Sequence, residues 1–461
     1  MFAFCGLAAL ISFIYIRPQE FIPLLARIPL LYLFFALAAF GLAVDIRLRV
    51  TRFKLPPQTL FVVLFFAWAL TTIAIYAPAD LMSSVIELMV IAVVFTLISI
   101  GVQSLRSFRW LIWLLAALSF ALAVVGVHQG NADLGCVEVD RESAEDLRTG
   151  TYDGRGCTEP SECYGGDANP SAGYLCEQIG LFGTTSIAGR VRYRGILQDP
   201  NELALAISVA WGLSFGLLGV GRRRRLTKLF VAVSGLVTGV CVVYTQSRGG
   251  MLVLLTVIGV YMLWRFGRKG ALVGGVLALA LVVVSSAGSG RKDADKSSEE
   301  RVEAWSTAVD LFKSNPVTGV GGDQFTKHHY LTAHNSYLLV AAELGLPGMF
   351  FWLAILYLSL KSSFLISMRY RGDPDAAEAV RLSDALFGAL CGLAVGSFFL
   401  SLSYHAVMWI MFGLSGALYG AVRAHDPKFR IRFGILDAAV VFGGGIALIV
   451  FVRIFLRLKG V

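Results

Sequence analysis

Residues 331–350, LTAHNSYLLVAAELGLPGMF, begin close to a histidine and an asparagine and continue as an almost unbroken apolar run. An apolar run of about 17 to 25 residues is long enough to cross the hydrocarbon core of a bilayer, which is roughly 30 Å thick. Within lipid, the backbone amides of such a run must be satisfied internally, as they are in a helix. The stretch therefore predicts a membrane-spanning helix over 336–360 with a histidine at its edge.

The rest of the chain has the same character. Of its 461 residues, 56% are hydrophobic and only 15% are charged, whereas about a quarter of the residues of soluble domains are charged. We therefore expect an all-α, polytopic membrane protein with about 12–13 transmembrane helices and two long outer loops. The apolar runs at 1–16 and 250–265 are short, which leaves 12 spans as an alternative to 13. The predicted spans lie near 1–16, 28–46, 58–76, 81–101, 108–127, 196–220, 226–246, 250–265, 270–287, 336–360, 384–401, 403–422 and 434–457.

The loops divide the chain into five parts. We expect N-terminal transmembrane helices over 1–127, a cysteine-containing periplasmic loop over 128–195, and central transmembrane helices over 196–287. A second periplasmic loop follows over 288–335, and C-terminal transmembrane helices occupy 336–461. The first span lacks a basic leading region and a small-residue cleavage site, so we do not expect a removable signal peptide.

The net charge of +9 is distributed in six basic clusters. With the predicted spans, all six clusters lie on one side of the membrane, as the positive-inside rule expects for the cytoplasmic side. This arrangement also puts the N-terminus in the cytoplasm. Because topology accounts for the excess of positive charge, we expect no nucleic-acid partner. The clusters are 47–54, 105–109, 221–225, 265–269, 369–371 and 428–432.

Four cysteines, Cys136, Cys157, Cys163 and Cys176, fall in the first outer loop. Four cysteines in one loop on the non-cytoplasmic side fit one or two disulfides in an oxidising compartment. Three connectivities are possible, and the sequence does not choose among them. A zinc site is the rival interpretation, although the spacing lacks paired C-x-x-C knuckles. We expect no metal ion and no cofactor.

The first cluster of polar residues is GRVRYRGILQDPNELALAI, residues 189–207, where the cysteine loop returns to the membrane. Arg190, Arg192 and Arg194 alternate, and Asp199 and Asn201 then begin an apolar helix. Asp199 followed by proline is typical of a capped helix start. One interpretation is a capped helix entry with snorkelling arginines. The other is an anionic ligand, because three arginines on the outer side oppose the topology rule.

The second cluster is YTQSRGGML, residues 244–252, a tight turn between two spans on the outer side. Two glycines follow Arg248, so the backbone can turn sharply and approach a ligand. Ser247 or the glycines leave amide groups at the start of the next helix, where anions bind readily. The turn also stands without any ligand, so a plain connection remains the alternative.

The third cluster begins at His334. A lone histidine is usually structural, but this one lies on the same side as Arg194 and Arg248, and a neutral imidazole can accept a proton from a hydroxyl. Asn335 can cap the helix or orient the ring. Gly345 and Gly348 thin the helix for close packing or for a kink at Pro347. Two weaker candidates, Tyr404-His405 in a short outer turn and RPQE at 17–20, are compatible with a site or with a structural role.

These motifs resemble a known family. His334-Asn335, nine residues and then Gly345-x-x-Gly348 is similar to the H-[N/S/Q]-x9-G-x-x-G pattern of the O-antigen ligases and the bacterial protein O-oligosaccharyltransferases. The blocks RYRGILQDPNELAL and SRGG also resemble those that precede this motif in the family, in the same order. The resemblance covers roughly 190–360. The cysteine-rich loop looks like an addition that the family pattern does not contain.

The resemblance implies a metal-independent, inverting glycosyltransferase that takes a glycan from undecaprenyl diphosphate at the periplasmic face of the bacterial inner membrane. Arg194 and Arg248, with Arg192, would bind the diphosphate, because guanidinium groups bind phosphate oxygens bidentately. His334 would activate or align the acceptor hydroxyl, with Asn335, Asp199, Asn201 and the two glycines in support. The implied partners are the lipid-linked donor, a lipid A–core acceptor and membrane lipids.

Four alternatives remain open. Protein oligosaccharyltransferases and polysaccharide polymerases share the motifs, so the acceptor is not determined by the sequence. A multi-span lipid or solute transporter would also place charge in the membrane, but transporters usually carry an internal repeat and broken helices at mid-bilayer. A structural assembly protein would not need arginines and a histidine gathered on one side.

Overall fold

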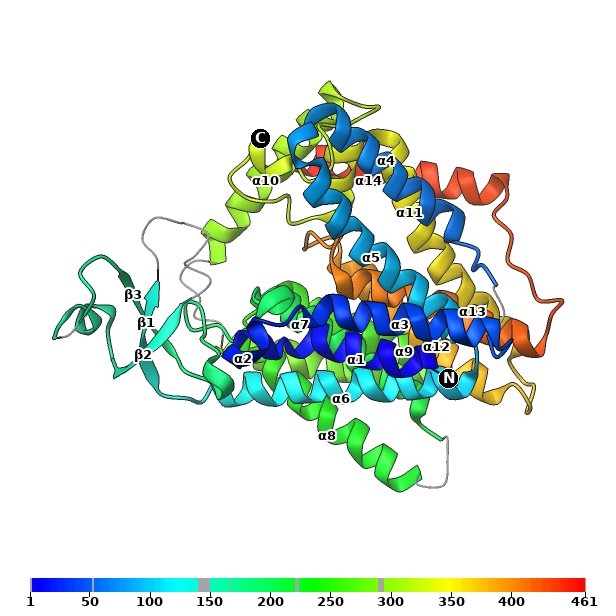
Figure 1. The fold of residues 1–461 in the computed structure, drawn as a ribbon, viewed down its shortest axis with the longest axis horizontal. Coiled ribbons are helices and arrows are strands. Elements are labelled where there is room, and N and C mark those ends of the chain that lie inside the picture. The colour runs from blue at the N-terminus through cyan, green and yellow to red at the C-terminus, as the bar shows by residue number, and fades with distance from the viewer. Residues whose placement is uncertain are drawn as a thin grey trace.

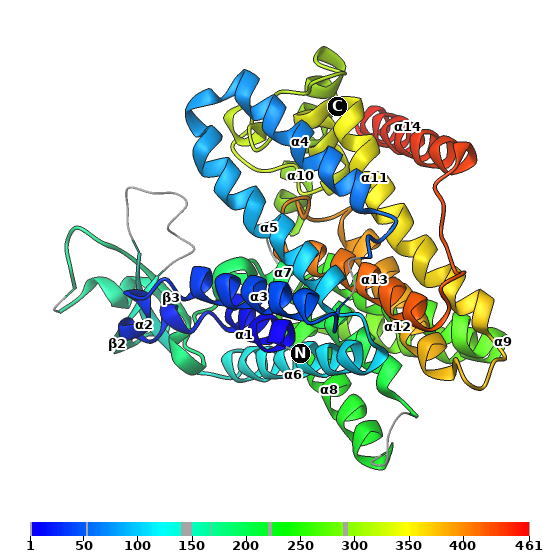
Figure 2. The ribbon, with the colours of Figure 1, turned by 45° about the vertical axis from the view of Figure 1, so that its right-hand side comes forward.

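The computed structural model describes residues 2–51, 54–139, 150–166, 168–219, 224–288 and 294–460, except for the side chains of Pro23, 277–288 and 294–297. Parts of the basic clusters, residues 52–53 and 221–223, lie outside the described residues. The protein is a bundle of long helices with one small sheet beyond its end (Figures 1 and 2).

The helices follow the predicted apolar runs. Eleven helices in the described part of the chain are long and apolar enough to cross a membrane, which confirms the all-α polytopic class. The helices are α1 (Phe2–Ile16), α2 (Pro23–Ala26), α3 (Leu30–Arg47), α4 (Thr59–Tyr76), α5 (Leu81–Gly101), α6 (Leu105–Gln129), α7 (Pro200–Leu213), α8 (Arg224–Tyr244), α9 (Arg248–Gly288), α10 (Ala294–Ser314), α11 (Ser336–Tyr370), α12 (Ala377–Gly396), α13 (Ala406–His425) and α14 (Ile435–Leu458).

Three predicted spans differ in form from the observed helices. The span predicted over 196–220 is the short helix α7, because Asp199 and Pro200 start the helix late and a 3-10 turn, Ser214–Leu217, ends it early. The spans predicted at 250–265 and 270–287 both lie in α9, which is broken at Gly267 with φ 59°. After this break the chain folds back, since a Cβ on Gly274 would lie 3.4 Å from the Cα of Gly259.

The first outer loop forms a small β-domain, which the all-α prediction did not include. Strands β1 (Leu134–Val139), β2 (Thr151–Gly156) and β3 (Gly173–Gln178) make an antiparallel sheet in the order β2-β1-β3. We call this segment, with its two disulfides, the disulfide domain. It lies beyond the end of α6 (Figure 1). Short polar strands of this kind have no strong apolar periodicity, which is why the sequence pattern did not reveal them.

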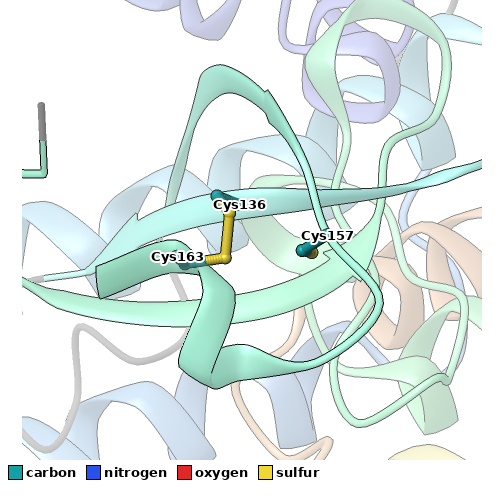
Figure 3. A group of neighbouring side chains, drawn as sticks. All are labelled: Cys136, Cys157 and Cys163. Atoms are coloured by element: carbon teal, nitrogen blue, oxygen red, sulfur yellow. A yellow bond between two sulfur atoms is a disulfide. The ribbon is translucent and has the colours of Figure 1, made fainter. Parts of the chain in front are cut away.

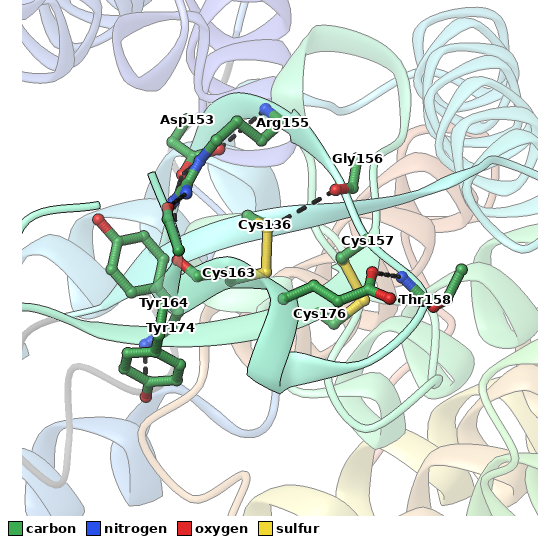
Figure 4. Close-up of a disulfide and its surroundings, with 12 residues drawn as sticks. Cys136, Asp153, Arg155, Gly156, Cys157, Thr158, Cys163, Tyr164, Tyr174 and Cys176 are labelled. Atoms are coloured by element: carbon green, nitrogen blue, oxygen red, sulfur yellow. Dashed lines mark hydrogen bonds and ion pairs between the residues drawn. A yellow bond between two sulfur atoms is a disulfide. The ribbon is translucent and has the colours of Figure 1, made fainter. Parts of the chain in front are cut away.

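The disulfide domain resolves the cysteine connectivity that the sequence left open. Cys136 is bonded to Cys163, and Cys157 is bonded to Cys176 (Figure 4). The second bond ties the end of β2 to β3, the strand that leads toward the arginine-rich segment at 189–194.

Basic clusters from several helices gather at one end of the bundle. At one end, Arg109 pairs with Glu378 at 2.7 Å, and Arg265 and Arg371 both pair with the buried carboxylate of Asp384 at 3.6 and 3.4 Å. These contacts bring basic clusters from α6, α9 and α11 together, and we call this the basic end. The disulfide domain, the α8–α9 turn and the start of α11 lie at the opposite end, which we call the disulfide end. The segregation agrees with the predicted alternation of loops.

Helix α11 is broken at Gly345, where φ is 64° and ψ is −163°. Pro347 has no N–H, so the carbonyl of Glu343 four residues earlier loses its helical donor. The loop before α11 supplies replacements: Gly321 N donates to Glu343 O and Val320 N to Ala342 O, both at 2.9 Å. The kink expected near Pro347 is confirmed, although the break itself lies two residues earlier.

Candidate active site at the disulfide end

Asp199 and Asn201 organise the start of α7 and connect it to the neighbouring turn. Asp199 Oδ1 accepts from Asn201 N at 2.6 Å, which confirms the predicted cap. Asn201 Oδ1 in turn accepts from Arg190 Nη2 at 3.1 Å and from Ser247 Oγ at 2.7 Å. The arginine-rich segment and the α8–α9 turn, predicted separately, are therefore joined through one amide side chain.

Arg192 and Arg194 both bond to the turn that follows β3, and Arg194 also ties this turn to the segment that follows α1. Arg192 is 4% exposed and donates to the carbonyl of Thr185 at 2.9 Å. Arg194 donates to three carbonyls, those of Glu20, Phe182 and Gly183, at 2.7–2.8 Å. Both arginines line a cavity of about 270 Å³ that also borders Thr184 and Gln198. Their predicted role in diphosphate binding stays a prediction, and the structure adds this bridging role.

Arg248 stands in the first turn of α9 and lines a larger cavity of about 690 Å³. Ser247 caps the helix, since its Oγ accepts from Gly250 N at 2.9 Å. The remaining wall combines aromatic rings with charged groups from α10 and α14, and it includes Arg301, Glu299, Glu303, Trp305, Phe399, Phe455 and Lys459. This wall joins aromatic rings to three cationic and two acidic side chains, and such a mixed lining suits a ligand that has both a charged group and an apolar or sugar part.

His334 is half-buried immediately before α11 and has a left-handed backbone with φ 45°. Non-glycine residues adopt this conformation rarely, and such residues cluster at active sites. The next residue, Asn335, is fully buried, and its Oδ1 accepts from Tyr337 N at 3.1 Å and Leu338 N at 3.2 Å. This confirms the predicted helix cap and fixes the chain directly beside the histidine.

The loop between α12 and α13, residues 397–405, brings these elements together. Its Ser401 Oγ lies 2.7 Å from the Oγ1 of Thr332, two residues before His334, and the Oγ of Ser336, two residues after His334, donates to Leu400 O at 2.6 Å. Phe399 of the same loop packs on Gly249, where a Cβ would approach the Phe399 Cβ to 3.2 Å. The loop thus contacts residues within two positions of His334 and the residue that follows Arg248. Its last residue, His405, also contacts Ile196 of the arginine-rich cluster, so all three predicted motifs meet around the loop.

His405, the last residue of this loop, has a structural role. Its Nδ1 accepts from Val407 N at 3.3 Å, so the proton is on Nε2, which donates to Ile196 O at 2.8 Å. Burial lowers the pKa of His405, against a smaller opposing effect of the hydrogen bond to Ile196. Of the other weak candidates, Arg17 and Glu20 form an ion pair at 2.6 Å near Arg194.

The sulfur atoms of Cys136, Cys157 and Cys163 form one group in the described residues that is compact enough to hold a metal ion (Figure 3). All three are bonded in disulfides, as Figures 3 and 4 show for the pair Cys136–Cys163. Metal ligation by cysteine needs a thiolate, which a disulfide sulfur is not. These residues therefore fit disulfides and not the rival zinc site.

The predicted site residues did not include Glu343 and Trp305, and the sequence pattern did not indicate the contacts of the 397–405 loop. Glu343 is 2% exposed within α11. A lone acidic residue inside an apolar span is itself a signal, because charge within a membrane is expensive and usually has a function. The aromatic wall at Trp305 could not be found in the same way, because it is assembled from helices distant in sequence.

Residues 232–353 match the family model for O-antigen ligase. The matched segment runs from α8 past the break in α11, so it contains Arg248, His334, Gly345 and Gly348. The arginines at 190–194 precede it. No curated protein matches the chain. The match confirms the resemblance to the O-antigen ligase-like superfamily, and it supports a glycosyltransferase-like enzyme of the ligase and polymerase kind in a multi-pass membrane protein.

Proposed function

We propose that this protein transfers a glycan from undecaprenyl diphosphate to an acceptor hydroxyl at the periplasmic face of the bacterial inner membrane, and that the acceptor is lipid A–core. The observation that carries the proposal is the meeting of the three motifs around the 397–405 loop, with Arg248 at a large cavity and His334 at the start of α11. The family match over 232–353 supports the same reaction class.

In the proposed reaction the acceptor oxygen attacks the anomeric carbon of the donor as the bond to the diphosphate oxygen breaks. Diphosphate is already a good leaving group, so the main requirement is fixed positive charge where negative charge develops. We assign this role first to Arg248, because it lines the cavity of about 690 Å³. Arg192 and Arg194 border a second cavity and would assist from there.

His334 takes the proton of the acceptor hydroxyl in this proposal, and no metal ion takes part. The acceptor oxygen attacks opposite the leaving diphosphate in a single displacement, which inverts the anomeric configuration. Neutral imidazole is suited to this near pH 7. The cap at Asn335 and the contact between Thr332 and Ser401 would hold the imidazole in one place, and fixed placement of two large substrates is a major part of catalysis.

The orientation follows from charge and cysteine chemistry. The basic end would face the cytoplasm, and the disulfide end would face the periplasm, where disulfides persist. The polyprenyl chain of the donor would lie along apolar helix surfaces in the membrane, which places the reacting diphosphate at the membrane surface beside Arg248.

The test is a lipopolysaccharide gel from a deletion strain of the host, complemented with wild type, His334→Ala or His328→Ala. His328 is an exposed histidine of the same loop and serves as the matched control. We expect bare core and accumulated lipid-linked glycan in the deletion strain, with rescue by wild type and His328→Ala only. Core with one repeat unit would indicate a polymerase. An unchanged ladder would overturn the lipopolysaccharide assignment and direct the search to glycoproteins.

A further inference from the structure

Glu343 is a buried carboxylate to which neither the motifs nor the proposed reaction gives a role. It is 2% exposed and lies in α11 two residues before the break at Gly345. In the described residues, no ion pair includes it, so its partners are neutral hydrogen-bond donors. Burying a carboxyl group costs free energy unless its oxygens accept hydrogen bonds, so these donors determine whether Glu343 can occupy this position.

The two carboxylate oxygens bind two different loops. Oε1 accepts from the backbone N of Phe325 at 3.2 Å. Oε2 accepts from the Tyr404 hydroxyl at 3.2 Å. Phe325 belongs to the segment that leads to His334, and Tyr404 belongs to the 397–405 loop. One carboxylate therefore fastens both segments to the same point of α11.

The contact at Phe325 is continuous with the segment that follows. His328 N and His329 N both donate to Phe325 O, at 2.9 and 3.2 Å, and the Phe325 ring is fully buried. His329 Nδ1 then accepts from Leu331 N at 3.1 Å. The chain from Phe325 to Thr332 is thus held by successive local bonds, and it reaches the 397–405 loop again through Thr332 and Ser401.

We propose that Glu343 is a positioning residue that acts through His334, by clamping the segment 325–335 and the 397–405 loop to the broken helix. The role rests on the proposed glycosyl transfer. The break at Gly345 makes it possible, because it diverts backbone groups of α11 to the loop at 316–321 and so brings that loop against Glu343. A carboxyl group has two oxygens that can each accept one of these hydrogen bonds, whereas an amide has only one, which accounts for a glutamate rather than a glutamine at this position.

The experiment uses the full-length protein in detergent with an undecaprenyl-diphosphate-linked glycan and lipid A–core. Glu343→Gln keeps the shape of the side chain but replaces one of its two accepting oxygens with an NH₂ group. Tyr404→Phe removes the hydroxyl that donates to Glu343 Oε2. Asp45→Asn is the control, because Asp45 is also a buried carboxylate that accepts two backbone amides, from Phe2 at 3.2 Å and Ala3 at 3.0 Å, at the basic end.

We expect Glu343→Gln to lower kcat about tenfold while the donor KM changes less than about twofold, a loss comparable to that of one hydrogen bond. Asp45→Asn should leave both constants unchanged. In a His334→Ala background, Glu343→Gln should cause no further loss, because it acts through that histidine. An additive loss in the double variant, or an equal rise of donor KM, would contradict the positioning role.

Hydrogen exchange separates failure of this inference from failure of the proposed function. The amides of 325–335 should exchange at least about tenfold faster in Glu343→Gln and Tyr404→Phe than in wild type, with no change in β3 or in Asp45→Asn. If wild type transfers no glycan but this pattern holds, the clamp stands and the proposed function falls. Unchanged exchange at 325–335 overturns the clamp whatever the activity.

Discussion

Arg248 occupies the one position where a motif arginine borders the larger cavity. We expect Arg248→Ala to lower the transfer rate by about 10²–10³, the loss typical when one group that stabilises developing negative charge is removed. Arg248→Lys should retain part of the activity, because lysine keeps the charge but loses the planar fork. The measurement is single-turnover transfer by purified protein. Arg430→Ala, an exposed arginine of a basic cluster, should behave as wild type.

His405 predicts a pH dependence of stability. Because burial lowers its pKa in the folded protein, the folded state binds this proton less readily than the unfolded state. The contribution of the neutral His405 imidazole to the free energy of unfolding is complete above the pKa of the unfolded state, about 6.5. This contribution is lost as the pH falls through that value toward the lower pKa of the folded state. We expect the thermal midpoint in detergent to fall below pH 6.5 in wild type, and to fall less steeply in His405→Gln.

An equal pH dependence of the thermal midpoint in wild type and His405→Gln would assign the acid sensitivity to other groups.

The roles of the two histidines could not both be predicted from the sequence. His334 and His405 are both lone histidines before an apolar helix, and the residue types do not separate them. Only the hydrogen bonds show that His405 is fixed between Val407 and Ile196, whereas the family pattern around Gly345 and Gly348 was what distinguished His334.

At the scale of elements, the break in α11 depends on Gly345. Its φ of 64° disfavours any side chain, and a Cβ there would clash with the carbonyl of Val317. We expect Gly345→Ala to destabilise the protein by at least about 1–3 kcal/mol, the range for a residue forced into a sparsely populated conformation. Thermal unfolding followed by intrinsic fluorescence measures the change.

The matched control is Gly239→Ala in α8, where a Cβ would meet nothing within 4 Å. Alanine is the better helix former by about 1 kcal/mol, so this variant should unfold at the same or a higher temperature. Equal behaviour of the two variants would mean that α11 can straighten at Gly345 without loss, and the loop at 316–321 would then not depend on the break.

The helices were predictable because each needs only a local apolar run, and the capping residues Asp199 and Asn335 marked two helix starts correctly. The partners of the loops were not predictable, because they are set by contacts between segments far apart in the chain, such as Ser401 with Thr332 or Tyr404 with Glu343. For the same reason, the sequence pattern predicted candidate site residues without showing that Arg192 and Arg194 bond to backbone carbonyls.

At the scale of the whole molecule, the disulfide domain supports the arginine-rich segment. Glu177 of β3, next to Cys176, accepts from Ser186 Oγ and from Ala188 N, the latter at 2.7 Å. Ser186 N also donates to Gln178 O at 3.1 Å. The bond between Cys157 and Cys176 therefore anchors β3, and residues 186–188 are hydrogen-bonded to that strand. Disulfide formation is in this way linked to the placement of Arg190 and Arg192.

We accordingly expect Cys157→Ser with Cys176→Ser to lower both stability and transfer. A disulfide closing a loop of this size, with a sequence separation of 19, contributes about 3 kcal/mol. Cys391→Ser, which changes a free and half-buried cysteine, should have neither effect. Thermal unfolding and transfer are measured with and without reductant. With reductant, the stability and activity of the wild type should approach those of the double variant. If the wild type stays active after full reduction, the arginine-rich segment holds its position without the disulfides.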